Sequence, residues 1–337
     1  MKAWEVRDTT GLDGLVLNRE RPMPEPDPGQ IVMRVRAAAL NYRDHGVLRG
    51  IYGYTKFPVI PLSDGAGEVA ACGPGVTRFK EGDRIAGTFF QTWPGGWMPD
   101  DASRNSLGGM IDGVLTDYAL LTDVGAIHTP AHLSFEGAAT LPCAALTAWN
   151  AVVEAARIRA GETIAILGTG GVSVFALAFA KMHGATVFLI SSSDEKLARG
   201  RVLGADHLIN YRATPEWDAE IRTRNGGAGV DHVVEVGGAN TLQRSMNLVR
   251  QGGGIYIIGS LAGAGSIDPR MINRKSIRLQ GIHVGSRDMF AAMNQAISAT
   301  GLRPQIDRVF AFEDAKAAYL HQQSGTHFGK IVISIAP

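Results

Sequence analysis

The chain has 337 residues, of which 45% are hydrophobic and 19% charged, and its formal net charge is +1. These values are typical of a folded globular protein, and the length exceeds what one hydrophobic core usually serves, so two domains are expected. The small net charge gives no reason to expect a nucleic acid or an anionic membrane as a partner.

The sequence contains two cysteines, Cys72 and Cys143. Two cysteines exclude a disulfide framework and a four-cysteine metal lobe. The first residues lack the apolar core of a signal peptide. The apolar run at 163–182 is interrupted by glycines, which favours a strand, a turn and a helix over a membrane span. We therefore expect a cytoplasmic protein with no membrane contact.

The chain first shows short strands and turns, up to about residue 123. β-Branched and small apolar residues at 30–40 and 65–73 are separated by Gly-rich turns. From Ser134 the pattern changes to an alanine-rich stretch that ends at residue 156, and it predicts a long helix with Ser134 as its N-cap.

Apolar strands and helices then alternate, which predicts a doubly wound parallel sheet and an α/β fold class. Strands are expected at 163–167, 186–190, 207–209, 232–236, 254–258 and 277–284. Helices are expected at 172–183, 195–203, 215–224 and 241–248. Another helix follows at 288–300, and the last residues predict a helix and a strand that returns to the first domain.

The loop after the first of these strands reads Gly168-Thr-Gly170-Gly171-Val172-Ser173. It matches the dinucleotide fingerprint G-x-G-x-x-G except for Ser173 at the third glycine position. Gly168 suits the tight turn, and Gly170 allows backbone N–H groups to approach a pyrophosphate at the helix N-terminus. The Ser173 hydroxyl has two possible roles, a bond to phosphate or a bond within its own helical turn.

The end of the second strand favours NADP(H) over NAD(H). An NAD site places a carboxylate there, whereas this chain has serines at 191–193 followed by Lys196. A 2′-phosphate would meet hydrogen-bond donors at Ser192 and Lys196. The alternative is that Ser192 and Glu195 form a capping box and that Lys196 lies on a solvated helix face.

The whole chain resembles the medium-chain dehydrogenase/reductase superfamily, and in particular its zinc-free, quinone-oxidoreductase-like branch. The resemblance implies a GroES-like, mainly-β catalytic domain at 1–128 and 285–337, with a Rossmann dinucleotide-binding domain inserted at 129–284. The stretches that carry it are 37–52, 61–69, 81–85, 141–149, 167–173, 203–211 and 328–333.

Zinc-dependent members of this superfamily hold a catalytic zinc with three ligands. At the matching positions this chain has Asn41 instead of cysteine, Ser63 instead of the histidine of a G-H-E motif, and Cys143 as the third. An amide and a hydroxyl are poor zinc ligands, so no metal is expected.

The resemblance also implies site residues. Asn41 and Tyr52 match positions at the nicotinamide end of the cleft, Thr147 a position near the carboxamide, and Lys196 and Tyr211 contacts of the adenosine phosphate. One departure is Gly46, where some quinone oxidoreductases carry a second tyrosine. Further cofactor contacts are expected at Gly171, Val172, Gly259, Val284 and Lys330.

These features predict NADPH-dependent transfer of a hydride to a quinone or an α,β-unsaturated carbonyl without a metal. Asn41 would stabilise the developing oxyanion and Tyr52 would donate a hydrogen bond or a proton, although both residues also suit structural roles. An NAD(P)-dependent alcohol dehydrogenase or aldehyde reductase and a non-catalytic NADPH-binding protein remain as alternatives. The apolar strand at 277–284 is an edge, so a homodimer is expected.

Overall fold

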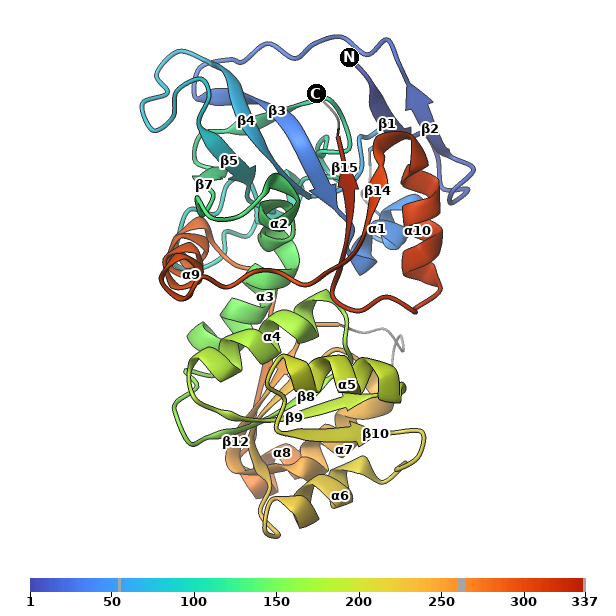
Figure 1. Ribbon diagram of the computed structural model, residues 1–337, viewed down its shortest axis with the longest axis vertical. Coiled ribbons are helices and arrows are strands. Elements are labelled where there is room, and N and C mark those ends of the chain that lie inside the picture. The colour runs from blue at the N-terminus through green and yellow to red at the C-terminus, as the bar shows by residue number, and fades with distance from the viewer. Residues whose placement is uncertain (54–55, 260–264, 336–337) are drawn as a thin grey trace. The chain divides into compact units, whose positions relative to one another are not determined.

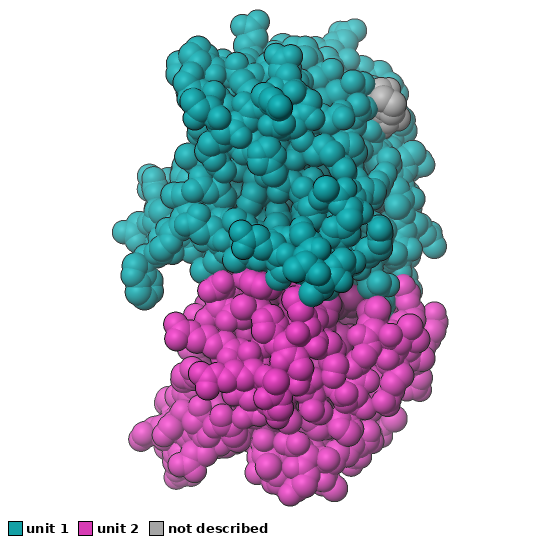
Figure 2. Space-filling view, turned by 60° about the vertical axis from the view of Figure 1, so that its left-hand side comes forward, with its two compact units in different colours: residues 1–146, 284–337 teal, residues 147–283 magenta. Residues whose placement is uncertain are grey.

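The computed structural model describes residues 1–53, 56–259 and 265–335. The chain divides into two compact units, Met1–Leu146 with Val284–Pro337, and Thr147–His283 (Figures 1 and 2). The division falls after Leu146 and not after residue 128, because helix α2 (Phe135–Ala139) packs against strands β3 and β4 of the first unit. The second division, before Val284, lies one residue from the expected position.

The first unit is built on a mainly antiparallel sheet. Its strand order is β14-β15-β3-β4-β5-β7, with β6 paired to β3, and β1 and β2 form a separate pair. Its strands are β1 Ala3–Val6, β2 Leu15–Asn18, β3 Gln30–Ala39, β4 Asp64–Cys72, β5 Arg84–Gly87, β6 Tyr118–Thr122, β7 Ala126–His128, β14 Ile306–Ala311 and β15 Lys330–Ser334. Its α-helices are α1 Tyr42–Leu48, α2 Phe135–Ala139, α9 Arg287–Thr300 and α10 Ala315–Gln323. Short 3₁₀ turns lie at Ala102–Asn105 and Phe312–Asp314.

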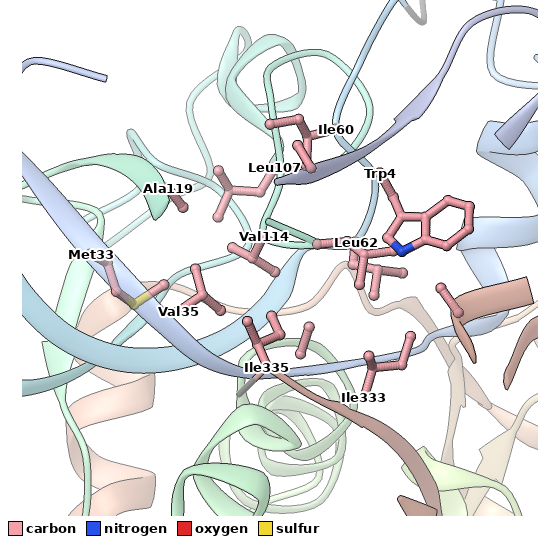
Figure 3. Close-up of a cluster of buried hydrophobic side chains, with 14 of the residues drawn as sticks. Trp4, Met33, Val35, Ile60, Leu62, Leu107, Val114, Ala119, Ile333 and Ile335 are labelled. Carbon is pink, nitrogen blue, oxygen red and sulfur yellow. The ribbon is translucent and has the colours of Figure 1, made fainter. Parts of the chain in front are cut away.

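The last strand returns to the first unit, as the sequence predicts. β15 pairs antiparallel with β3 and parallel with β14. Most of β3 is buried, and only its middle, at residues 33–37, alternates between buried and less buried residues, because there one face covers the core of the unit and the other carries two arginines. That core contains Met33 and Val35 of β3, Ile333 of β15 and Val114 of a loop (Figure 3).

The second unit contains a six-stranded parallel sheet of order β10-β9-β8-β11-β12-β13. Counted within the unit, this order is 3-2-1-4-5-6, the order of the Rossmann fold. Its strands are β8 Thr163–Leu167, β9 Thr186–Ser191, β10 His207–Asn210, β11 Val230–Glu235, β12 Val249–Ile257 and β13 Arg278–Gly281. Its helices are α4 Gly171–Met182, α5 Asp194–Val202, α6 Trp217–Arg224, α7 Ala239–Leu248 and α8 Pro269–Lys275. All six expected strands are present, whereas the seven-residue α8 was not predicted.

The alanine-rich stretch is helical but interrupted. Ser134 is the N-cap of α2 and accepts a hydrogen bond from the Gly137 N–H at 3.2 Å, as predicted. Two π-type turns, Leu141–Ala145 and Asn150–Ala155, flank the short helix α3 (Leu146–Trp149). The first contains Pro142, whose ring and missing N–H disturb regular i→i−4 bonding.

The apolar run at 163–182 forms β8, a turn and α4, in agreement with the prediction. In the described part of the chain, no helix combines the length and the apolar character that a membrane span requires.

Candidate functional site

The register of three strands brings distant residues together in the first unit. Ala39, the last residue of β3, pairs with Asp64, the first residue of β4, and with Val332 of β15. Asn41 follows the end of β3, and Lys330 is the first residue of β15. The sheet therefore collects Asn41, Asp64 and Lys330 at one end, although Lys330 and Asn41 are 289 residues apart in the chain.

Lys330 is a buried cation with three oxygen neighbours. Its side chain is 3% exposed. Its Nζ donates to the carbonyl oxygen of Leu40 at 2.6 Å and to Oδ1 of Asn41 at 2.7 Å. Oδ2 of Asp64 lies 3.6 Å from the same Nζ. The ammonium is thus hydrogen-bonded and has a carboxylate beside it, as a buried charge requires.

The Asp64 carboxylate joins two further residues to Lys330. Its Oδ1 accepts a hydrogen bond from the Ser63 hydroxyl at 2.7 Å, and its Oδ2 accepts one from the Cys143 N–H at 3.2 Å. Burial, reinforced by the negative charge of Asp64, raises the pKa of the Cys143 thiol well above its usual value. We call Asn41, Ser63, Asp64, Cys143 and Lys330 the Lys330 cluster.

Leu62 places Ser63 and Asp64 through an unusual backbone conformation. Its φ is +68°, in the left-handed region that favours glycine, and the G-H-E motif of zinc-dependent members has glycine at this position. The Leu62 side chain is fully buried in the core of the unit (Figure 3). Burial of this side chain offsets the backbone strain, which is of order 1–3 kcal/mol.

Asn41 presents a buried donor that the described residues leave unsatisfied. The residue is 9% exposed, and its Nδ2 has no hydrogen-bond partner within the described ranges. Its Oδ1 is used by Lys330, so the amide N–H group is the part of the side chain that remains for a ligand. A buried unsatisfied donor costs about 1–3 kcal/mol, which a bound acceptor would recover.

Helix α1 follows Asn41 and carries a buried acid. Oδ2 of Asp44 accepts a hydrogen bond from the Asn41 backbone N–H at 2.7 Å. Burial raises the pKa of Asp44 to about 6, opposed by the Arg43 guanidinium, which lies 3.8 Å from Oδ1. The backbone around Asn41 is therefore tied to a carboxyl that titrates in an accessible pH range.

Tyr52 packs on the helix that begins after Asn41. The Arg43 guanidinium lies 5.9 Å from the centre of the Tyr52 ring and 4.6 Å from that of Phe89. A side chain at Gly46 would place its Cβ 2.7 Å from Cε2 of Tyr52. In this chain the Tyr52 ring therefore occupies the space next to position 46, where some quinone oxidoreductases carry a second tyrosine.

The glycine loop in the second unit has the geometry expected of a phosphate-binding turn. It follows β8 and opens α4. Gly168 has φ +78°, and its N–H donates to the Ile190 carbonyl of β9 at 2.7 Å. Gly170 is the N-cap of α4, and apart from its neighbours along the chain no atom of the described residues lies within 4 Å of where its Cβ would be. An anion can therefore approach the first N–H groups of the helix closely.

Ser173, at the third glycine position, is bound to the protein. Its hydroxyl donates to the Leu167 carbonyl at the end of β8, at 2.7 Å, and the residue is 2% exposed. The hydroxyl thus uses its proton for the Leu167 carbonyl and not for a group in its own helical turn. It joins the start of α4 to the end of β8.

Near the residues expected to contact the adenosine phosphate, the structure corrects one prediction. The N-cap of α5 is Ser193, whose Oγ accepts a hydrogen bond from the Lys196 N–H at 3.3 Å, so the expected capping box of Ser192 with Glu195 is wrong. Ser192 lies before the cap and is half-buried. The Tyr211 N–H donates to the Ser191 carbonyl at 3.0 Å, which places the end of β10 beside that of β9. Ser192, Lys196 and Tyr211 thus all follow the ends of two neighbouring strands.

The other expected cofactor residues lie in several elements. Gly171 and Val172 are the first residues of α4, and Thr147 is buried in α3. Gly259 follows β12, where a Cβ would come within 2.8 Å of the Val236 carbonyl oxygen. Val284 is the first residue after the second unit and has φ +53°. Lys330 lies in the first unit, in the cluster described above.

Glu235 was missed by the sequence interpretation. It ends β11 and is fully buried. Its carboxylate accepts hydrogen bonds from the N–H groups of Gly237 and Gly238 at 2.8 and 3.1 Å, from the Thr241 hydroxyl at 2.6 Å, and from the Ser245 hydroxyl. It thereby fixes the turn after β11, which contains Val236. That turn borders the glycine loop, because a Cβ on Gly168 would lie 3.7 Å from the Val236 side chain.

Comparison with known proteins decides the family. Residues 27–131 match the family described as alcohol dehydrogenase GroES-like domain, and residues 171–299 the family described as zinc-binding dehydrogenase. A zinc-type alcohol dehydrogenase-like protein of Schizosaccharomyces pombe is 40% identical, and the match covers 97% of each sequence. The chain belongs to the medium-chain dehydrogenase/reductase superfamily.

Other members of the superfamily agree with this assignment. Quinone oxidoreductase of Rattus norvegicus is 28% identical over 99% of this chain and 97% of its own. A crystal structure of a putative alcohol dehydrogenase from Sinorhizobium meliloti superposes with a TM-score of 0.92, at 39% identity, over 99% of this chain and 98% of that one. The predicted fold, a GroES-like domain with an inserted Rossmann domain, is confirmed, and the chain is an NAD(P)H-dependent oxidoreductase.

Two of these names refer to zinc, but the residues of the Lys330 cluster are not those of a zinc site. A catalytic zinc requires three thiolate, imidazole or carboxylate ligands. The cluster offers an amide, a hydroxyl, a thiol of raised pKa and Asp64, whose oxygens already accept two hydrogen bonds. The Lys330 ammonium also stands where it would repel a second cation. These residues do not fit a zinc ion, and elsewhere in the described ranges no group of three or more His, Cys, Asp or Glu could hold a metal.

Proposed function

We propose that this oxidoreductase uses NADPH to reduce a quinone or an α,β-unsaturated carbonyl without a metal. The observation that carries the proposal is the Lys330 cluster, which offers a hydrogen-bond donor, Nδ2 of Asn41, where zinc-dependent relatives place a metal ligand. A hydrogen bond meets the charge that develops during reduction of a conjugated carbonyl. Alcohol oxidation gains much more from a Lewis acid that lowers the pKa of the hydroxyl.

Different residues have different roles in the proposed reaction. The turn after β8 and the start of α4 would hold the pyrophosphate through backbone N–H groups. When bound, NADPH supplies the hydride. Asn41 stabilises the negative charge on the substrate oxygen through Nδ2. The Tyr52 phenol donates a hydrogen bond or a proton, a step in which water competes with it.

An alcohol dehydrogenase or aldehyde reductase is the second candidate. It is favoured by the names of the relatives from Schizosaccharomyces pombe and Sinorhizobium meliloti. The rat relative bears the name of a quinone oxidoreductase. Sequence similarity therefore does not choose between the two candidates, and the chemistry of the cluster favours reduction of a conjugated carbonyl.

A screen of cofactor oxidation separates the candidates. Purified protein with NADPH is offered quinones, enones and aldehydes, and with NADP⁺ it is offered alcohols, with and without excess chelator. We expect turnover of quinones or enones that the chelator leaves unchanged, and no stoichiometric zinc by elemental analysis. About one zinc per chain, with activity lost on its removal, would establish the alcohol dehydrogenase. No turnover of any substrate would favour a non-catalytic NADPH-binding protein.

The choice of NADPH rests on the serines at and directly after the end of β9, residues 191–193, and on Lys196. Lys196→Ala should weaken NADPH binding by about 1–3 kcal/mol and leave NADH binding nearly unchanged, because only NADPH carries the 2′-phosphate. Titration of cofactor fluorescence measures both. Equal losses for the two cofactors would contradict the phosphate contact.

We also propose a homodimer formed through β13. This strand is the last of its sheet, and Arg278, Gln280 and Gly281 on it are exposed. An exposed edge strand is a template for pairing with a second copy. Light scattering at micromolar concentration should give twice the mass of the chain, and a monomer would contradict the proposal.

A further inference from the structure

The contact between Lys330 and Asn41 determines how the Asn41 amide is turned. A lysine ammonium has three N–H donors and no acceptor. Its Nζ lies 2.7 Å from the Asn41 side chain, so the carbonyl oxygen of that amide must face it. Rotation of the amide by half a turn would direct two N–H bonds at a cation. Nδ2 is therefore held on the side away from Lys330.

Asp64 holds Lys330 in turn. Both side chains are nearly inaccessible, at 3% exposed for Lys330 and fully buried for Asp64, and 3.6 Å separates Nζ from Oδ2. A buried ammonium without a counter-charge is strongly destabilising. Ser63 and Cys143 bind the two Asp64 oxygens and fix the carboxylate. Ser63 and Cys143 thus hold Asp64 in place, Asp64 holds Lys330, and Lys330 holds the Asn41 amide.

We propose that Lys330 is a positioning residue of the reductase, which fixes the Asn41 amide so that Nδ2 donates to the substrate oxygen. The ammonium on Oδ1 also polarises the amide, and this makes Nδ2–H a stronger donor, since hydrogen bonds in a chain reinforce one another. The proposal rests on the proposed function. It differs from a cofactor contact of Lys330, because it predicts an effect on turnover that passes through Asn41 and leaves NADPH affinity unchanged.

A double-mutant cycle tests this role. Asn41→Ala removes the donor and should lower kcat for an enone by about 10²-fold, as loss of one oxyanion donor does. Lys330→Met frees the amide to turn and should lower kcat by about tenfold, with the NADPH Kd within about twofold of the original value. In the Asn41→Ala background, Lys330→Met should cause no further loss of kcat, because the group through which it acts is absent.

Two further variants guard against general damage to the protein. Lys330→Met leaves Asp64 without a counter-charge, so the cycle is repeated with Lys330→Met/Asp64→Asn, which removes both charges together. Lys181→Met is the matched control. Its Nζ also contacts one carbonyl, Ala185 at 2.9 Å, and one carboxylate, Asp206 at 2.8 Å, where β9 and β10 of the second unit begin. This control should leave kcat unchanged.

The possible outcomes distinguish a failure of the Lys330 positioning role from a failure of the proposed reductase activity. The positioning role would be overturned if Lys330→Met lowered kcat by the same factor in the original chain and in Asn41→Ala. It would also be overturned if Lys330→Met weakened NADPH binding without lowering kcat. Neither result would contradict the proposed reductase activity. If no quinone or enone is reduced, the proposed function fails, and the ¹H–¹⁵N signal of the Asn41 side-chain amide becomes the test. Its identity follows from its disappearance in Asn41→Ala. It should shift and broaden in Lys330→Met and not in Lys181→Met, and an unchanged signal would overturn the proposal.

Discussion

The two candidate sites, one in each unit, are built in different ways. In the second unit, the turn between β8 and α4 offers backbone N–H groups, and Ser173, at the third glycine position of the fingerprint, is bound to the Leu167 carbonyl. In the first unit, the side chains of the Lys330 cluster balance one another's charge and hydrogen-bond to one another, and Nδ2 of Asn41 is the donor left without a partner among the described residues. A site made of backbone tolerates changes of side chain, whereas a site made of buried charges depends on each of its members.

The largest effect is expected where a buried charge loses its partner. Asp64→Leu leaves the Lys330 ammonium without a carboxylate in a site that excludes water. Removal of one partner of a buried ion pair costs about 3–5 kcal/mol. The free energy of unfolding in urea should fall by that amount, and Lys330→Met in the Asp64→Leu background should recover part of it. A loss below about 1 kcal/mol would place the pair among weak surface pairs.

The neighbouring acid, Asp44, gives the cluster a dependence on pH. Folding raises its pKa from 3.8 to about 6, so the folded state binds the proton more tightly than the unfolded state does. Its contribution to stability is complete below about pH 4 and is lost as the pH rises through about 6. Asp44→Asn stays neutral throughout and its Oδ1 can still accept the Asn41 N–H.

The stability of Asp44→Asn relative to the original chain should therefore increase between pH 4 and 6, by up to about 3 kcal/mol, and remain constant at higher pH. Urea unfolding at several pH values measures this difference. Arg43 opposes the effect, because the ionised carboxylate attracts its guanidinium. A difference that does not change with pH would mean that Asp44 titrates at its ordinary value.

The backbone site of the second unit was easier to predict from the sequence than the side-chain cluster of the first unit. The glycine loop is a local pattern of six residues between a strand and a helix, so it was identified from spacing alone. The six strands of the second unit were predicted from apolar segments that alternate with helices along the chain. The N-cap is Ser193 because α5 begins at Asp194, whereas a cap at Ser192 would make Ser193 the first helical residue. Adjacent serines carry no signal that separates these two possibilities.

The Lys330 cluster could be predicted only in part. Its members come from four separate segments, and the register of β3, β4 and β15 brings them together. The resemblance to zinc-dependent members marked Asn41, Ser63 and Cys143, and it gave Lys330 a cofactor contact. No pattern in the sequence indicated that Lys330 binds Asn41, or that Glu235 supports the turn after β11, since both depend on tertiary contacts.

Glu235 is an exception in the candidate site of the second unit, because here a side chain determines the backbone conformation. Its buried carboxylate holds the turn after β11 through two backbone N–H groups and two hydroxyls. Glu235→Gln places an amide NH₂ against some of these donors and should lower the free energy of unfolding by about 2 kcal/mol. It should also weaken NADPH binding, because the turn borders Gly168. Glu216→Gln, on an exposed residue that binds Arg244, is the control. Unchanged cofactor affinity would confine Glu235 to a role in folding.

The smallest effect on stability is expected at Ser173, where this chain departs from the G-x-G-x-x-G fingerprint. Ser173→Gly restores the third glycine of G-x-G-x-x-G but removes the hydrogen bond to Leu167 and adds a flexible residue near the start of α4. The free energy of unfolding should fall by about 1–2 kcal/mol, the sum of these two costs. The NADPH Kd should stay within about twofold, because the phosphate site that we propose consists of backbone groups. Ser173→Ala removes the hydroxyl alone and divides the loss between its two causes. A tenfold weaker NADPH complex in both variants would show that the hydroxyl leaves Leu167 to bind phosphate, and the site in the second unit would then depend on a side chain after all.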